Sequence, residues 1–164
     1  MTTTEIITTT EVRDLALRTS TFDAKLLEDY ILPAQRQYLR PFLGKDYYNE
    51  ILTQVEASTL SADNSTLLNS YLKPALAYFV VYDAFPNISM NITNKGIFIN
   101  ESETSQSASG GDRGGLRQNV SSMAERWRKD AKQFIRDEQD DDSTKFPDFS
   151  DQDTNKNKGL PIPY

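Results

Sequence analysis

Carboxylates are the most numerous side chains of this chain that could take part in catalysis or metal binding. The 164 residues include 24 Asp and Glu but no cysteine and no histidine. Disulfides, thiolate nucleophiles, Ser-His and Cys-His catalysis and nearly all zinc sites are therefore excluded. An enzyme made from these residues would have to use carboxylates, Lys, Tyr or Arg, for example as a magnesium-dependent nuclease.

The acidic residues concentrate in the segment DEQDDDSTKFPDFSDQD near the C-terminus. At its end, Asp151, Asp153 and, two residues further on, Asn155 match the first ligands of an EF-hand calcium loop. The sixth position of that loop is Lys156 where the motif needs Gly, and its twelfth is Ile162 where the motif needs Glu. The segment also has the composition of a disordered chain, which cannot hold octahedral metal geometry. We therefore predict no metal site, no cofactor, no catalytic residue and no enzymatic activity.

One row of cations is a second candidate for a functional site, in this case a binding surface. Arg128, Lys132 and Arg136 recur every four residues and would form a basic stripe on a helix. The stripe is either a solvated face with distant counter-charges or a contact with an acidic surface of a neighbouring subunit or partner. A role facing DNA is weaker, because the net charge of −6 and the pI near 4.7 argue against a protein that mainly grips nucleic acid.

The elements that would position these residues are helical. Apolar residues at intervals of three and four predict a short helix after Thr10, a helix from Thr21 or Asp23 to Gly44, and a helix over 46–56. A long apolar helix follows the SADNS turn and should stop near Phe85-Pro86. The fold class is therefore mainly α, a small bundle of about four to five helices. Proline in YILPA (30–34) and YLKPA (71–75) should kink two of them.

The last predicted helix, 116–138, has the clearest amphipathic pattern. Its apolar seam consists of Val120, Met123, Ala124, Trp127, Ala131, Phe134 and Ile135.

A β-hairpin is predicted between the last two helices. Ile88, Met90 and Ile92 alternate, and a turn and a return strand follow. The residues of the hairpin that would contact a subunit or partner are Ile92, Asn94, Lys95, Gly96, Ile97, Phe98 and Ile99. The hairpin either packs on its own helices or adds strand edges to a neighbouring subunit. With the Ser- and Gly-rich loop that follows, it covers residues 88–115.

The two ends of the chain complete the domain organisation. Residues 1–9 are threonine-rich and predict an extended arm, residues 10–140 form the helical domain, and residues 141–164 form an extended or disordered tail. The tail carries apolar residues that favour docking on a partner: Phe146, Phe149, Leu160, Pro161, Ile162, Pro163 and Tyr164. No apolar run approaches the length of a membrane span and the N-terminus lacks a signal peptide, so we expect synthesis in a cytoplasm and no membrane partner.

The order of these segments resembles the head–tail connector or adaptor proteins of tailed bacteriophages. The resemblance covers roughly residues 5–140 and is closest to the neck ring proteins of crAss-like phages and related prophages. Its most distinctive pieces are AQRQYLRPFLG (34–44) and the order helix, NKG, loop and Trp-bearing helix. None of these pieces is a catalytic signature, and the tail lies outside the match.

The resemblance implies a structural protein of the virion neck, between capsid and tail. About twelve copies would form a ring beneath the portal protein, continue the DNA channel without sequence-specific binding, and offer a platform to adjacent neck or tail proteins. The alternative is a small helical adaptor or regulatory protein that binds a partner through its last helix and tail. That alternative predicts a small solution mass and no affinity for a portal.

Overall fold

The protein is mainly helical, as predicted. A computed structural model describes residues 4–18, 23–95 and 110–149, and within these ranges it contains no strand. The elements in chain order are α1 (Thr9–Val12), η1 (Arg13–Leu17), η2 (Ala24–Leu27), α2 (Glu28–Ala34), η3 (Gln35–Leu39), α3 (Arg40–Leu43), α4 (Lys45–Ala57), α5 (Ala62–Leu67), η4 (Leu68–Leu72), α6 (Lys73–Lys95) and α7 (Gly110–Asp141).

The first helix begins two residues earlier than predicted, with Thr8 as its cap. The Thr8 hydroxyl accepts a hydrogen bond from the backbone N–H of Glu11, and the Glu11 carboxylate accepts one from the N–H of Thr8. This reciprocal capping box satisfies two backbone donors that a helix start leaves free. Glu11 also forms an ion pair of 2.7 Å with Lys73, which ties the first helix to the start of α6.

Asp23 and Gly44 limit the next helical segment, as the sequence predicts. The Asp23 carboxylate accepts a hydrogen bond from the backbone N–H of Lys25. At the other end, α3 stops at Leu43 because Gly44 has φ 82°, a conformation that glycine adopts without steric cost. α4 begins immediately after this glycine.

Two widened helical turns precede prolines. In η3 the N–H of Arg40 donates to the carbonyl of Gln35, and in η4 the N–H of Lys73 donates to that of Leu68. Both bonds span five residues, so each turn is a π-turn, and each donor is followed directly by a proline. A proline ring collides with the carbonyl four residues earlier in a regular α-helix, and a wider turn gives it room. The related pair is therefore Pro41 and Pro74, whereas Pro33 lies inside α2.

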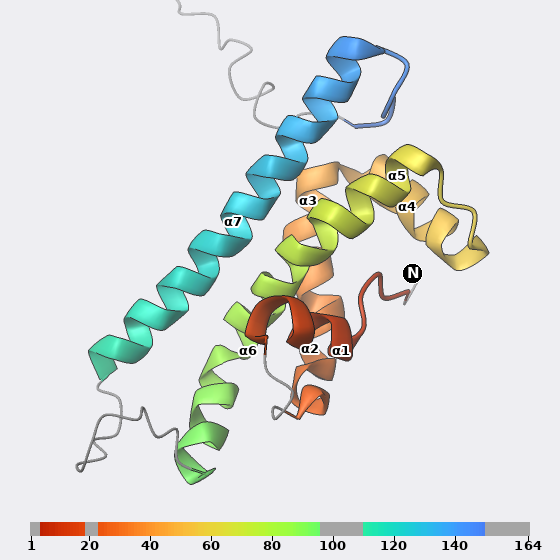
Figure 1. Ribbon diagram of the computed structural model, residues 1–164. Coiled ribbons are helices and arrows are strands. Elements are labelled where there is room, and N and C mark those ends of the chain that lie inside the picture. The colour runs from red at the N-terminus through yellow and green to blue at the C-terminus, as the bar shows by residue number, and fades with distance from the viewer. Residues whose placement is uncertain (1–3, 19–22, 96–109, 150–164) are drawn as a thin grey trace, which may run out of the picture.

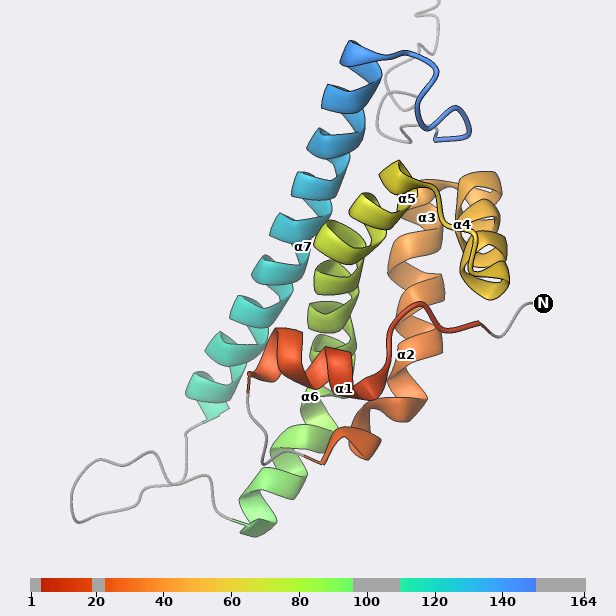
Figure 2. The same ribbon diagram turned by 45° about the vertical axis from the view of Figure 1, so that its right-hand side comes forward.

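The core is one apolar cluster that all the major helices share. Helix α7 lies along one side of the bundle next to α6, as the two views in Figures 1 and 2 agree. Ala124, Ala131 and Ile135 of α7 are fully buried. The rest of the predicted seam also packs against the core, namely Val120, Met123, Trp127 and Phe134. The predicted seam is thus confirmed.

The prediction that a hairpin strand begins at Ile88 is wrong. Helix α6 does not stop at Pro86 but continues to Lys95, so Ile88, Ile92, Asn94 and Lys95 are helical. Ile88 is buried against the core, and this burial stabilises the helix beyond the proline. The predicted return strand and its turn glycine lie outside the described residues, namely Gly96, Ile97, Phe98 and Ile99.

The described part of the predicted N-terminal arm packs on its own chain. Ile6 and Ile7 are buried in the core. From the start of η3, the side chain of Gln35 accepts a hydrogen bond from the N–H of Ile6 (3.0 Å) and donates one to the carbonyl of Thr4 (3.0 Å). Because Gln35 itself is only 1% exposed, the segment is fixed by a buried polar contact and is not an arm that reaches a neighbour.

Candidate functional site

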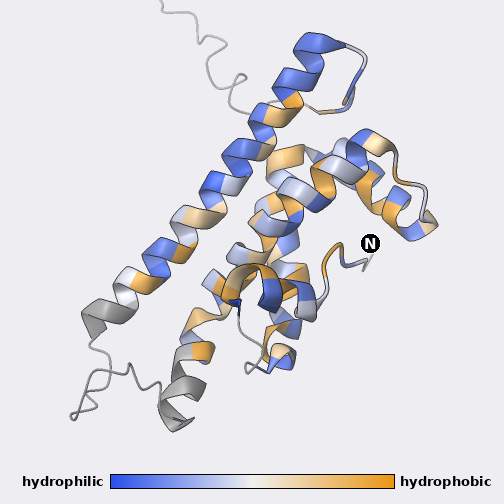
Figure 3. Ribbon diagram, in the orientation of Figure 1, coloured by the Kyte–Doolittle hydropathy of each residue, from blue (hydrophilic) through white to orange (hydrophobic). Residues whose placement is uncertain are grey.

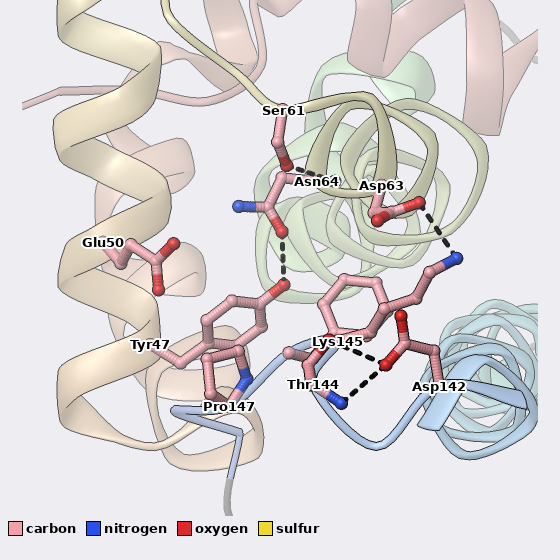
Figure 4. Close-up of a pocket in the computed structure, with 10 residues that line it drawn as sticks. Tyr47, Glu50, Ser61, Asp63, Asn64, Asp142, Thr144, Lys145 and Pro147 are labelled. Carbon is pink, nitrogen blue, oxygen red and sulfur yellow. Dashed lines mark hydrogen bonds and ion pairs between the residues drawn. The ribbon is translucent and has the colours of Figure 1, made fainter. Parts of the chain in front are cut away.

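A pocket of about 310 Å³ lies where α4, α5 and the segment after α7 meet (Figure 4). It is lined by Tyr47, Glu50, Ser61, Asp63, Asn64, Asp142, Thr144, Lys145, Phe146 and Pro147. Most of these side chains are polar, and they come from three segments that are far apart in the sequence. The pocket is therefore the best candidate for chemistry among the described residues.

Tyr47 and Asn64 are the buried polar residues that line the pocket. The Tyr47 hydroxyl donates a hydrogen bond of 2.8 Å to Asn64 Oδ1, and Asn64 Nδ2 donates one of 2.8 Å to Gln54 Oε1. The Ser61 hydroxyl caps α5 by accepting from the N–H of Asn64. Burial raises the pKa of Tyr47 well above its usual range, with smaller contributions from Glu50 and Asp63. The phenol therefore stays protonated at neutral pH.

Lys145 lines the pocket from the segment that follows α7, and its side chain is partly exposed. Its ammonium group contacts the carboxylates of Glu138 and, at 3.5 Å, Asp63, so it links α7 to α5. The hydrogen bond to Glu138 is the main cause that raises the pKa of Lys145. Beside it, Asp142 accepts hydrogen bonds from the N–H and the hydroxyl of Thr144, which turn the chain at the end of α7 and lower the pKa of Asp142.

Two aromatic side chains of the predicted tail pack on the bundle here: Phe146 lines the pocket, and Phe149 lies three residues further along the chain. Phe146 is 4% exposed, and its ring meets the rings of Tyr47 and Phe134 edge to face at 6.0 Å. Phe149 contacts Phe42 at 6.0 Å in the same way. Phe146 has φ 49°, an uncommon conformation for a bulky residue that costs of order 1 kcal/mol or more. Burial of its ring offsets that cost.

The structure therefore corrects the prediction for the start of the tail. Phe146 and Phe149 dock on their own bundle and not on a partner, because Tyr47, Phe42 and Phe134 supply the apolar surface they need. Sequence reasoning missed the pocket, although two phenylalanines three residues apart in an acidic segment were a signal of docking. The other tail residues predicted to dock, Leu160, Pro161, Ile162, Pro163 and Tyr164, lie outside the described residues.

The pocket has the character of a structural joint. The two groups that enclose it, Tyr47 and Lys145, have raised pKa values and both stay protonated at neutral pH, so neither is a base there. Over the ranges that the structure describes, no three acidic side chains lie close enough together to hold a metal ion. What the arrangement does is hold the C-terminal segment against α4 and α5.

The predicted basic stripe lies on one flank of α7, beside the buried seam. Arg128 forms an ion pair of 2.6 Å with Glu125, one turn earlier on the helix. Arg128 and Lys132 are half-buried and Arg136 is exposed. Lys132 and Arg136 also take part in interactions of their own. The structure thus brings the three cations together, which is what the four-residue spacing predicts.

A second polar cluster joins the start of α7 to the bundle. The Tyr38 hydroxyl donates a hydrogen bond of 2.8 Å to Asp83 on α6, while its ring stacks on Phe79. The Arg117 guanidinium lies over the ring of Tyr82, 4.4 Å from its centre. Burial, followed by the hydrogen bond to Asp83, raises the pKa of Tyr38 far above its usual range. No sequence pattern indicated this cluster.

None of the described helices is both long enough and apolar enough to cross a membrane. The chain matches the model of DUF6712, a family of unknown function, over residues 39–159, which is well over half its length. The chain therefore belongs to this family. The match includes the start of the C-terminal segment that docks at the pocket. Searches of curated proteins and of solved structures found no similar protein.

Proposed function

We propose that this member of the DUF6712 family is a structural subunit of a phage virion, one copy in the head–tail connector ring beneath the portal. About twelve copies would continue the DNA channel and present a platform to adjacent neck or tail proteins. DNA would pass through the lumen without sequence-specific binding. The subunit would be made in the host cytoplasm and would carry no enzymatic activity.

The resemblance of residues 5–140 to connector proteins motivates the proposal, and α7 is the structural observation that carries it. This helix of 32 residues is about 48 Å long at the α-helical rise. It buries one seam in the bundle and leaves a polar face along the outside, as the hydropathy colouring in Figure 3 shows. A long, straight, polar outer face suits side-by-side packing of identical subunits around an axis.

The test is the solution mass of the chain by light scattering, with negative-stain images, alone and mixed with a phage portal protein from the same genome. Rings, free or on the portal, are the expected result. A monomer that does not bind the portal at any concentration would contradict the proposal. Binding of one copy to an unrelated partner would instead favour the small adaptor.

The adaptor alternative has lost part of its basis. It used the last helix and the tail as ligands for a partner, but the seam of α7 and two tail aromatics, Phe146 and Phe149, are engaged inside the chain. Only the outer face of α7 and residues beyond the described C-terminal segment remain for such a role. The connector proposal needs only the outer face.

A further inference from the structure

Helix α7 carries opposite charges on its two flanks. With 100° between successive residues, Arg128, Lys132 and Arg136 lie on one side of the buried seam. The acidic residues of the second flank are Asp130, Asp137 and Asp141, and they lie on the other side of the seam. All three are exposed. The buried seam of Ala124, Ala131 and Ile135 runs between the two flanks.

We propose that α7 is the contact between neighbouring copies of this chain, with the basic flank of one copy against the acidic flank of the next. This rests on the proposed function, for which it names the subunit interface. A ring is built from heterologous contacts, in which two different patches of one subunit meet on adjacent copies. Oppositely charged patches on the two sides of one outer helix meet that requirement, and like charges would oppose self-pairing of either flank.

The two flanks lie at nearly the same height on the helix. The basic flank is centred on position 132 and the acidic flank on position 136, which differ by about 6 Å at the α-helical rise. Patches at similar height are compatible with a rotation between neighbours that has little axial shift, and closure into a ring requires such a rotation. Patches at very different heights would give an open helical filament.

Two exposed intramolecular pairs on these flanks are compatible with the contact, and Lys132 and Arg136 take part in further interactions of their own. Glu125 neutralises Arg128 from within the basic flank, and Gln133 donates a hydrogen bond of 2.6 Å to Asp137 on the acidic flank. Such exposed interactions contribute little to stability and exchange partners at low cost. Next to the basic flank, Lys129 adds an exposed cation and Asp140 an exposed carboxylate, and Arg126 is an exposed cation near the acidic flank.

The test uses charge reversal on each flank of the full chain. One variant is D130K/D137K/D141K, with two basic flanks, and the other is R128E/K132E/R136E, with two acidic flanks. Each alone should associate at least about tenfold more weakly than the wild type, because every contact opposes like charges. Their equimolar mixture should recover association, because alternating copies then place a basic flank against an acidic one at every contact.

A matched control carries the same charge change away from α7. R36E/R40E/K45E alters three exposed cations on η3, α3 and α4 and should associate like the wild type. Circular dichroism checks that all variants keep the helical fold. Sedimentation equilibrium, with and without the portal protein, measures association. The wild-type association should also weaken as salt increases.

The outcomes separate this inference from the proposed function. Recovery in the mixture supports the α7 contact even if no sample binds the portal, in which case the connector proposal alone fails. Portal-bound rings that form equally well from each reversal variant would overturn the α7 contact and keep the connector. A wild type that stays monomeric with and without the portal would overturn both.

Discussion

The first and last described segments of the chain pack on the same bundle through different contacts. The N-terminal segment buries Ile6 and Ile7 and is also held by the amide of Gln35, which bonds Thr4, Ile6 and the hydroxyl of Tyr48. The C-terminal segment is held by aromatic rings, chiefly Phe146 against Tyr47 and Phe134. A polar anchor depends on every partner being present, whereas an aromatic anchor depends on the area that is buried. Four experiments test this difference, in order of decreasing expected effect.

The largest effect is expected for Phe146→Ala. Loss of a buried phenylalanine ring leaves a cavity between α4 and α7, and such a change costs about 3–5 kcal/mol in the free energy of unfolding. Chemical denaturation followed by circular dichroism measures it. Phe149→Ala is the matched control and should cost clearly less, because Phe149 is only half-buried. Equal losses would mean that burial does not set the strength of this anchor.

Gln35→Leu comes next. Leucine cannot bond the N–H of Ile6 or the carbonyl of Thr4, and a buried polar group left without a partner makes the expected loss about 2–3 kcal/mol. Faster hydrogen exchange at the Ile6 amide should accompany it. Gln37→Leu, at an exposed position of the same turn, should change stability by no more than about 0.5 kcal/mol. Unchanged exchange at Ile6 would contradict the polar anchor.

Alkaline pH should weaken the C-terminal joint. The pKa of Tyr47 is raised in the folded protein above its ordinary value of 10.0, so its contribution is complete below pH 10 and is lost as pH rises further. The wild type should therefore lose stability above pH 10, and Tyr47→Phe should lose less. Tyr38 also has a raised pKa, so Tyr38→Phe measures how much of the stability loss above pH 10 comes from Tyr38. A Tyr47→Phe variant with the full wild-type slope would refute the assignment.

Acid should weaken the N-terminal side, with the smallest effect. Burial alone would raise the pKa of Glu11, but hydrogen bonds from Lys73 and Thr8 outweigh it and lower the pKa below 4.5. This contribution is present above the unfolded pKa and is lost as pH falls through the folded one. The stability difference between the wild type and Glu11→Gln should therefore shrink in acid. In a double-mutant cycle at neutral pH, the stability loss caused by Glu11→Gln should be smaller in the Lys73→Met background than in the wild type.

Local patterns in the sequence predicted much of the fold. The three- and four-residue spacing gave the buried seam of α7 because one face of a helix is a local property. Three alternating residues, Ile88, Met90 and Ile92, are too short a run to distinguish a strand from a helix. The pocket was missed because Tyr47 and Phe146 are separated by 99 positions, and no local pattern predicts that contact.

The π-turns before Pro41 and Pro74 have a consequence for comparing this chain with its relatives. Each turn holds one residue more than a regular helix would, and that residue rotates everything after it by about 100°. A one-residue deletion in 68–72 would turn the later part of the helix away from the core unless the collision with Pro74 were also removed. Loss of either proline should therefore accompany a one-residue gap just before it in an alignment of the family.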